Sequence, residues 1–429
     1  MNAPYTSRFL LNLTPDEFTE VQRAELADRI ATYFMPNPKL KYAGVAGLGR
    51  HGGALLFREY DEQSVPARRI IVKYSLDEEA DNDLRNESRC LEYLRGAKHI
   101  VQLISLPGAE LNVSGTGRRP CIALEFMPHG DGSMFRRKLR DLGRRVTPSR
   151  LLWRIFLCLV RQCIAMAYPP RGGPDAPVFR EVIRDNEAPS GLSQNSSHLG
   201  NIVFGDLDLS DIEHNLTPLI KLIDFGRGEI EDPDGANLAN IFGAAFMLVA
   251  LALPRVNSRE LYVDFEEENL NEYQLSSGEI IQTFSIGAIR NEQNIDVELR
   301  DLIALCQSTN ATVPTLPYLL ARCEDGVANR TLQDFDNSSF SEFDRYSEED
   351  GSIQYIIRHT LLDADVRDAP QDTSRPTINT QVGTTLVGLF DSQYMAWSKI
   401  PPIPPENEKS FWETFNESIN RMREEDDVG

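Results

Sequence analysis

The stretch GLGRHG, residues 47–52, places three glycines at the spacing G-x-G-x-x-G between candidate strands. Glycines at this spacing let backbone N–H groups approach phosphate oxygens, because no Cβ stands in the way. Glycines in an ordinary hairpin turn would produce the same pattern. The spacing therefore makes Gly47, Gly49 and Gly52 candidate phosphate-binding residues and leaves the structural alternative open.

A lysine lies inside the apolar run RIIVKY, residues 69–74. A charged side chain in such a run needs a partner or a ligand to offset its desolvation. Glu87 is the expected partner of Lys73, because Leu91 and Leu94 follow it at helical spacing on the core side and direct its carboxylate toward the strand. A structural ion pair and a lysine facing water at a sheet edge are the alternatives.

The elements expected around Lys73 follow the order strand, strand, helix, strand, strand. LLF at residues 55–57 and RIIVKY are joined by the turn-rich DEQSVPA and predict a hairpin. A helix that carries Glu87 is expected next. The runs IVQLISL at residues 100–106 and CIALEF at residues 121–126 predict the last two strands.

The second half of the chain is expected to be mainly helical. From Ser149 the sequence is long and apolar enough for a buried central helix, which Pro169 and Pro170 should end. The next segment, rich in Gly, Pro, Asn and Asp, reaches Ser197 and predicts a long loop, either functional or partly disordered. Two short strands then carry the motifs SSHLGNIV and LIDFGRG, and helices dominate after Ala236.

Composition is typical of a globular protein. The chain has 429 residues, 41% of them hydrophobic, which is enough for one two-lobed domain or two small domains with appendages. Its formal net charge of -21 argues against general binding to nucleic acid or to anionic membranes. The apolar run at residues 241–253 is shorter than the roughly 20 residues that a bilayer requires, and the first residues lack a signal-peptide layout. Six cysteines without a CxxC pair are expected to be reduced and mostly buried, so we expect a cytoplasmic protein with no membrane partner.

The chain resembles the protein-kinase-like superfamily, and particularly kinase-like proteins found in fungi, from about residue 41 to about residue 320. The resemblance is carried, in order, by GLGRHG, IIVK, Glu87, ALEFMPHGDG, HLGN and KLIDFG. A DFG sequence preceded by an apolar strand is a specific signal when an Asn-containing loop lies just upstream, as it does here.

The resemblance implies an α+β, two-lobed protein-kinase-like fold. A small β-rich N-lobe with one main helix would span residues 41–127, and a larger, mostly helical C-lobe residues 128–330. A helical N-terminal extension (1–40), a helical and acidic extension (331–398) and a Pro-rich acidic tail (399–429) would flank these lobes.

The resemblance also implies ATP and Mg²⁺ as cofactors. The three glycines would cover the phosphates, Lys73 would contact them while pairing with Glu87, and backbone groups from Glu125 to Met127 would bind the adenine. Asn201 and the catalytic residue Asp224 would hold magnesium, whose preference for hard oxygen ligands suits an amide and a carboxylate.

The catalytic loop departs from the kinase pattern at the base. Kinases carry H-R-D-L-x-x-x-N, and counting back from Asn201 puts Ser196 where the Asp should stand. A serine hydroxyl does not accept a proton at neutral pH as a carboxylate does, and loss of a general base typically costs about 10²–10⁴ in rate. His198 is the candidate replacement base, although the matching His of small-molecule kinases is largely structural.

The segment after the DFG sequence is too short for a peptide platform. About ten residues, RGEIEDPDGA, precede the helix expected from Asn237, and no A-P-E sequence follows. The Arg that kinases place before a later Pro is also missing, because Val313 precedes Pro314. A regulated protein kinase is therefore disfavoured, which leaves a pseudokinase that binds nucleotide or a small-molecule phosphotransferase whose acceptor pocket would use the loop at residues 170–195.

A basic segment supports a third interpretation. Its cations are Arg136, Arg137, Lys138, Arg140, Arg144, Arg145, Arg150 and Arg154. They predict either a solvated helix face or a patch for tRNA or another anion. The kinase fold would then serve aminoacyl-tRNA-dependent chemistry, as in fungal arginine-containing cyclodipeptide synthases. The D-D-x-x-E motif associated with that family has its closest, imperfect match at Asp83 and Glu87.

Overall fold

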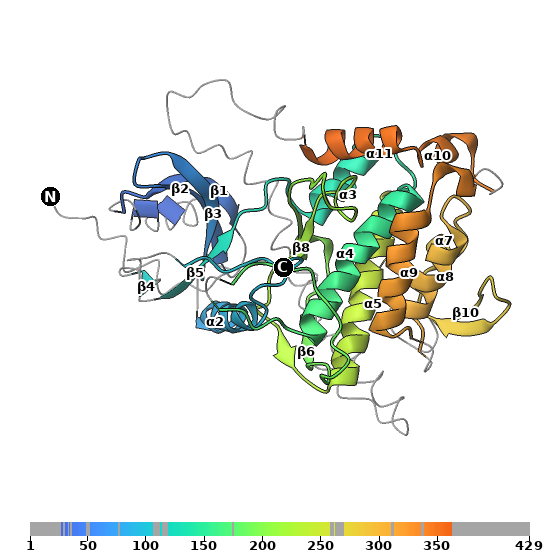
Figure 1. The fold of residues 1–429 in the computed structure, drawn as a ribbon, viewed down its shortest axis with the longest axis horizontal. Coiled ribbons are helices and arrows are strands. Elements are labelled where there is room, and N and C mark those ends of the chain that lie inside the picture. The colour runs from blue at the N-terminus through green and yellow to red at the C-terminus, as the bar shows by residue number, and fades with distance from the viewer. Residues whose placement is uncertain are drawn as a thin grey trace, which may run out of the picture.

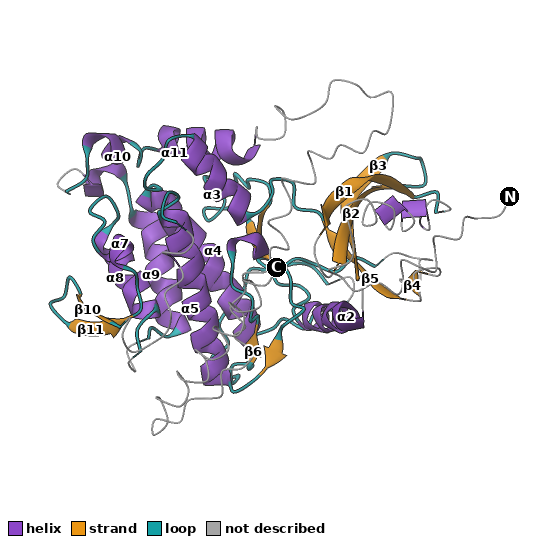
Figure 2. Cartoon of the chain, turned by 180° about the vertical axis from the view of Figure 1, so that it is seen from behind, coloured by secondary structure: helices purple, strands orange, loops and turns teal. Residues whose placement is uncertain are grey.

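The protein is a mixed α+β molecule with a small antiparallel sheet and many helices. Both views place the sheet and helix α2 (Glu78–Tyr93) at one end and most of the helices at the other (Figures 1 and 2). The computed structural model describes residues 27–362, apart from residues 29–30, 33, 35–36, 49–51, 76–77, 106–111, 114–118, 174–175, 258–260, 262–269, 310–312 and 336–338. The expectations for residues 1–26 and 363–429, including the acidic tail at residues 399–429, lie outside the described residues.

The sheet has the strand order β1-β2-β3-β5-β4, with each neighbouring pair antiparallel. Its strands are β1 (Leu40–Leu48), β2 (Gly52–Tyr60), β3 (Pro66–Ser75), β4 (Asn112–Val113) and β5 (Arg119–Glu125). The predicted hairpin is therefore confirmed as β2 and β3. Successive side chains of a strand point to opposite faces, so Ile70, Val72 and Tyr74 lie in one buried cluster and Lys73 points to the other face, toward α2.

Two long buried helices form the centre of the helical part. They are α4 (Ser149–Ala167) and α5 (Pro233–Ala252), which pack against each other (Figure 1). Helix α9 (Leu316–Asn329) packs along α4, and α8 (Val297–Cys306) contacts α5. The predicted central helix is confirmed, and it ends at Ala167, with Tyr168 as its C-cap, because Pro169 and Pro170 follow.

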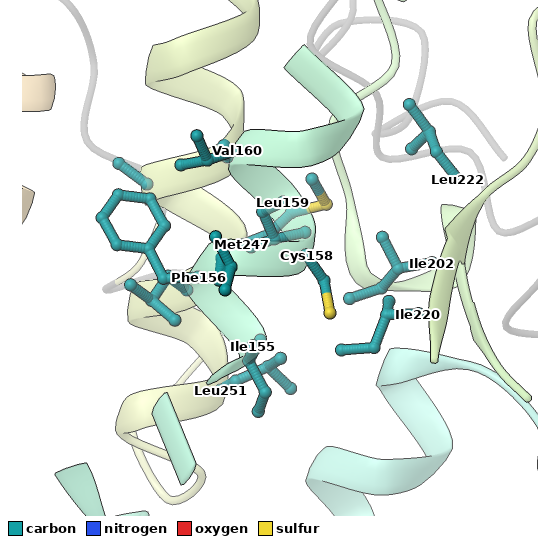
Figure 3. Packing of buried hydrophobic residues seen from close by; sticks show 14 of the residues in the cluster. Ile155, Phe156, Cys158, Leu159, Val160, Ile202, Ile220, Leu222, Met247 and Leu251 are labelled. Atoms are coloured by element: carbon teal, nitrogen blue, oxygen red, sulfur yellow. The ribbon is translucent and has the colours of Figure 1, made fainter. Parts of the chain in front are cut away.

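The core between these helices is made of large apolar side chains. Figure 3 shows Ile155, Phe156 and Leu159 of α4 with Met247 and Leu251 of α5 in one buried cluster. Each is exposed by 3% or less, and complete burial of such a side chain contributes roughly 1.5–3 kcal/mol. This packing fixes α4 and α5 as the frame on which the shorter elements lie.

The remaining elements are short. Three two-stranded pairs are β6 (Leu192–Ser193) with β9 (Glu229–Ile230), β7 (Ile202–Phe204) with β8 (Ile220–Leu222), and β10 (Asn271–Gln274) with β11 (Ile280–Thr283). The other described helices are α3 (Gly132–Asp141), α7 (Gly287–Arg290), α10 (Glu342–Tyr346) and α11 (Asp350–Ile357), together with 3₁₀ turns at Leu199–Asn201 and Leu332–Phe335 and a π turn at Arg358–Leu362.

The strand predicted at residues 100–106 is wrong for its described residues. Ile100 and Leu103 form only isolated bridges, to Leu222 and Leu124. The backbone of this run divides its hydrogen bonds between two elements: Val101 donates to Leu222 at 3.1 Å, and Ile104 donates to Ala123 at 2.8 Å, so it extends neither ladder. The side chain of Gln102 also donates locally, to the carbonyl oxygens of Ala97 and Ile100 at 2.9 and 2.8 Å.

Helix α5 begins at Pro233, four residues before the predicted start at Asn237. Asp232 caps it by accepting a hydrogen bond from the backbone N–H of Gly235 at 3.2 Å, and Pro233 occupies the first turn, where a missing N–H costs nothing. The segment between Gly226 and the helix is therefore even shorter than the sequence suggests.

Among the described helices, α5 alone is long and apolar enough to cross a membrane. Its earlier start gives it 20 residues, more than the apolar run at residues 241–253 indicates. Most of this helix is buried against its neighbours, as in the core helix of a globular protein, so length and composition are weak grounds for a membrane span here.

Candidate functional site

Lys73, Glu87 and Asp224 meet although they lie on three different elements. Lys73 is on β3, Glu87 is on α2, and Asp224 follows β8. The Lys73 Nζ donates to Glu87 Oε2 at 2.7 Å and to Asp224 Oδ1 at 2.9 Å. The expected pairing of Lys73 with Glu87 is confirmed, and the alternative of a lysine facing water at a sheet edge is excluded, because β3 lies between β2 and β5.

One ammonium group therefore serves two carboxylates. Burial lowers the pKa of Lys73, but Asp224 and Glu87 outweigh burial and raise this pKa above its usual value. Burial raises the pKa of Glu87 to about 7, against the effect of Lys73. Burial also acts to raise the pKa of Asp224, but Lys73 outweighs it and lowers that pKa. With both acids ionised, the three side chains carry one excess negative charge.

Asn201 lies beside this group. It ends the 3₁₀ turn before β7, and its carbonyl oxygen accepts a hydrogen bond from Ile223, the residue before Asp224, at 2.9 Å. Its side-chain Nδ2 donates to the carbonyl oxygen and the hydroxyl of Ser196 at 2.9 and 3.0 Å. Its Oδ1 is buried and has no hydrogen-bond partner in the described part of the chain. A buried amide oxygen without a donor is a candidate ligand for a hard cation.

The backbone at Asp224 is strained. Its φ is 64°, in the left-handed region that residues other than glycine rarely adopt. Such a conformation costs about 1–3 kcal/mol and is found mainly where the surrounding structure enforces it for function. In this conformation the Asp224 Oδ1 accepts the hydrogen bond from Lys73 Nζ at 2.9 Å.

Helix α2 also holds the chain that follows Asp224. The Asn86 Nδ2 donates to the carbonyl oxygens of Gly226 and Gly228 at 3.0 and 2.7 Å. Further along, β9 pairs with β6. The short segment after the DFG sequence is thus attached on both sides, to α2 and to the strand before Ser196.

The position expected for a catalytic base holds the buried Ser196. Its hydroxyl accepts from Asn201, and its backbone N–H donates to Gln194 Oε1 at 3.1 Å. No carboxylate replaces the missing Asp at this position.

His198 is poorly suited to replace the base. Its Nδ1 accepts a hydrogen bond from the backbone N–H of Gly200 at 3.1 Å, so the neutral ring carries its proton on Nε2. Burial lowers the pKa of His198 to about 4, against the effect of Asp224, so the ring is neutral at pH 7. With one nitrogen occupied and the other protonated, the ring has no free lone pair for a substrate proton. This geometry favours the structural interpretation of His198.

The two described glycines of GLGRHG lie in strands β1 and β2. Gly47 is buried in β1 opposite Ala54, and Gly52 begins β2 opposite Ser75, while Gly49 lies outside the described residues. A Cβ at Gly52 would lie 2.4 Å from the carbonyl oxygen of Tyr74. The close approach of β3 is therefore sufficient to require glycine at position 52, and phosphate contact by these residues stays a prediction.

Glu125 and Met127 lie where the sheet leads into the helical part. The Glu125 carboxylate accepts from Lys221 Nζ at 2.5 Å and from the backbone N–H of Gln102 at 2.7 Å. Met127 packs near Gly205, where a Cβ would lie 2.7 Å from the Met127 Cε. The side chain of Glu125 is thus committed to the structure, and binding of adenine by the backbone of residues 125–127 stays a prediction.

Sequence reasoning missed the polar residues that hold this site in place. Gln194, at the end of the long loop, donates through Nε2 to the carbonyl oxygen of Asp224 at 2.9 Å. Asn240 of α5 donates to the carbonyl oxygen of Leu192 at 2.9 Å and accepts from the backbone N–H of Gln194 at 3.2 Å. Asn240 could have been found as a polar residue within an apolar helix, whereas nothing in the sequence spacing indicates Gln194.

Several cations of the predicted anion patch are engaged within the protein. Arg144 is buried and stacks on Phe343 at 4.8 Å, Arg145 pairs with Glu292 at 3.1 Å, and Arg136 donates to the carbonyl oxygen of Val256. The last two cations of the basic segment are also engaged: Arg150 donates to the carbonyl oxygens of Arg330 and Glu348, and Arg154 donates to that of Ile212. These contacts commit five of the eight cations to the protein itself, and binding of tRNA or another anion by this segment stays a prediction.

Comparison with known proteins adds no relative. Neither the protein-family models nor the curated proteins give a match to this chain. The proposals below therefore rest on the geometry of the described residues.

Proposed function

We propose that the protein binds a magnesium–nucleotide complex in a two-lobed, kinase-like arrangement and transfers phosphate weakly or not at all. The observation that carries the proposal is the Lys73 ammonium held between Glu87 and Asp224, at 2.7 and 2.9 Å, beside the unpartnered Oδ1 of Asn201. The sheet with α2 would form the smaller lobe and the helices around α4 and α5 the larger one.

The donor set fits magnesium. Asn201 Oδ1 and the Asp224 carboxylate are hard oxygen ligands, and a dication would offset the excess negative charge left by one lysine and two acids. Magnesium supplies neutralisation of triphosphate charge when it is bound. Lys73 would bind the phosphates directly, and Glu87 would keep its ammonium in place.

Weak transfer follows from the residues opposite the metal ligands. Ser196 stands where a base is expected, and the Nδ1 of His198 is occupied by Gly200. Phosphoryl transfer depends mostly on positioning and electrostatics. The same nucleotide site would therefore also suit a small-molecule phosphotransferase in which the acceptor loses its proton by another route. The middle of the long loop contacts Lys98 and His99, and its end, at Gln194, contacts Asp224 and would border an acceptor.

A thermal shift experiment tests nucleotide binding. Ligand present at about 100 times its Kd stabilises a protein by about 2.7 kcal/mol, so ATP with magnesium should raise the Tm by several degrees. Asp224→Asn and Lys73→Met should abolish this rise, because they remove the negative charge of the metal ligand and the phosphate contact. Asp208→Asn in an exposed turn and the exposed Lys41→Met are matched controls that should keep it.

Two results would contradict the proposal. One is a wild-type Tm that does not respond to any purine nucleotide with magnesium up to millimolar concentration. The other is a rise in Tm that persists in both Asp224→Asn and Lys73→Met, since nucleotide would then bind elsewhere.

A further inference from the structure

Three side chains of types that bind metals lie together and are separate from the group of Lys73, Glu87 and Asp224. They are His99 in the turn after α2, Cys158 in the middle of α4, and His214 in the turn between β7 and β8. One donor atom from each lies within 4.8 Å of the other two, and all three residues are buried with exposures of 0–1%. No sequence spacing indicates this cluster, because its members are more than fifty residues apart.

Glu181 orients His99 for such a site. The His99 Nδ1 lies 2.6 Å from Glu181 Oε2, and the His99 backbone N–H donates to Glu181 Oε1, also at 2.6 Å. This pairing occupies Nδ1 and leaves Nε2 to face the cluster. A histidine that binds a metal through one nitrogen usually donates from the other to a carboxylate or carbonyl, which fixes the ring and strengthens the ligand.

The remaining nitrogens of the two rings are buried without partners. The His99 Nε2 and both ring nitrogens of His214 have no hydrogen-bond partner in the described part of the chain. The rings are 5.2 Å apart between centroids and tilted by 45°, so stacking does not satisfy these nitrogens. Figure 3 shows Cys158 on the side of α4 that faces Ile202 of β7 and Ile220 of β8. The turn between these two strands carries His214. Buried polar atoms without partners are rare in native proteins, and a bound ion is one arrangement that satisfies them.

We propose that His99, Cys158 and His214 bind a zinc ion. Thiolate and imidazole ligands favour zinc and disfavour magnesium or calcium. Zinc lies about 2.0–2.1 Å from nitrogen and about 2.3 Å from sulfur, so the donors of a tetrahedral site are roughly 3.5 Å apart. Because the donors already lie within 4.8 Å of one another, each pair needs to close by no more than about 1.3 Å when the ion enters.

The charge of the site balances with zinc present. The dication is offset by the Cys158 thiolate and by the Glu181 carboxylate that holds His99, so no net charge is buried. The nearby Lys98 and Arg180 are already paired with Asp211 at 2.6 and 2.7 Å. The ion ties the turn after α2 to helix α4 and to the β7–β8 turn, which makes it a structural link between the sheet end and the helical end.

Metal analysis of the untagged full chain tests the site. Protein purified without chelator should contain about one zinc per chain. Cys158→Ser and His214→Gln should lose it, whereas Cys163→Ser should keep it. Cys163 is a matched control because it is equally buried on the same helix but lies outside the cluster. Glu181→Gln should weaken zinc affinity about 10–100-fold and still bind one zinc at saturation, as expected for a positioning residue.

Spectroscopy of the wild-type protein provides a test that does not depend on folding of the variants. Cobalt(II) added to chelator-treated protein should give thiolate-to-cobalt charge-transfer absorption, and X-ray absorption of the zinc form should show one sulfur among nitrogen or oxygen ligands. A wild-type chain that takes up neither metal would overturn the proposal, as would a cobalt band that persists in folded Cys158→Ser.

Discussion

At the scale of residues, single side chains in the candidate site each make several hydrogen bonds or ion pairs. Lys73 serves two acids, and Asn201 uses both amide hydrogens on Ser196 while its oxygen stays unpartnered. The sequence predicted the contact of Lys73 with Glu87, because a buried lysine needs a partner and helical spacing directs Glu87 toward it. The contact of Asp224 with the same ammonium could not be predicted in this way, because residue spacing does not indicate the left-handed backbone conformation of Asp224.

His198 provides a test by pH. A histidine whose pKa falls from 6.5 to about 4 on folding takes up its proton more readily in the unfolded chain. Its contribution to stability is therefore complete above pH 6.5 and is lost as the pH falls toward 4. We expect His198→Gln to remove up to about 1.4 kcal/mol of pH dependence per pH unit in this window, measured by urea unfolding.

The comparison of the wild type with His198→Gln has an internal control at high pH. Above pH 7 the wild type and His198→Gln should differ by a constant free energy of unfolding, because both residues are neutral there. Parallel curves from pH 7 down to pH 4 would show that folding does not lower the pKa of His198, and its assignment as a neutral structural residue would fail.

At the scale of elements, the position of the loop that carries Ser196 depends on a close approach to α5. A Cβ at Gly243 would lie 2.0 Å from the Ser197 Oγ and 2.6 Å from its Cβ. Gly243→Ala should therefore displace this loop and lower the free energy of unfolding by about 1–2 kcal/mol, despite the better helix propensity of alanine. The nucleotide-dependent rise in Tm should shrink in the same variant.

Two further variants separate the clash from the helix effect. Gly351→Ala lies in α11 with open space around it and should stabilise the protein by up to about 1 kcal/mol. Ser197→Gly combined with Gly243→Ala should recover most of the loss. If the double variant is no more stable than Gly243→Ala alone, the Ser197 contact is not the cause.

Elements with a strong local signal were predictable from the sequence. Helix α4 has continuous apolar character and two prolines after its end, and the β2–β3 hairpin has strand-forming runs around a turn. The run at residues 100–106 looks equally strand-like, but its described backbone bonds partly to Leu222 and partly to Ala123, so it extends neither ladder. The start of α5 was misplaced because the capping bond from Asp232 extends the helix beyond its apolar run.

At the scale of the whole molecule, Arg161 links segments far apart in the sequence. From α4 it donates to Glu213 and Glu324, both at 2.7 Å, and to the carbonyl oxygen of Glu181 at 2.9 Å. Arg161→Met should cost about 3–5 kcal/mol in urea unfolding, because it leaves buried carboxylate oxygens of Glu213 without their main cation.

Arg322→Met is the matched comparison for Arg161. Arg322 pairs with Glu298, but both side chains are partly exposed, so its removal should cost less than about 1 kcal/mol. Equal costs for the two variants would show that burial does not set the value of the Arg161 network. Such long-range networks, like the cluster of His99, Cys158 and His214, cannot be predicted from spacing, because they form only when distant segments pack together.

The hydrogen bonds from Asn86 have a consequence for how a ligand would enter. Asn86 and Glu87 are adjacent on α2. One turn of this helix is therefore bonded both to Lys73 of the sheet and to the backbone just after Asp224. These hydrogen bonds restrain the three parts relative to one another. A nucleotide bound as proposed would meet groups that are already positioned, so the protein would give up less conformational entropy on binding.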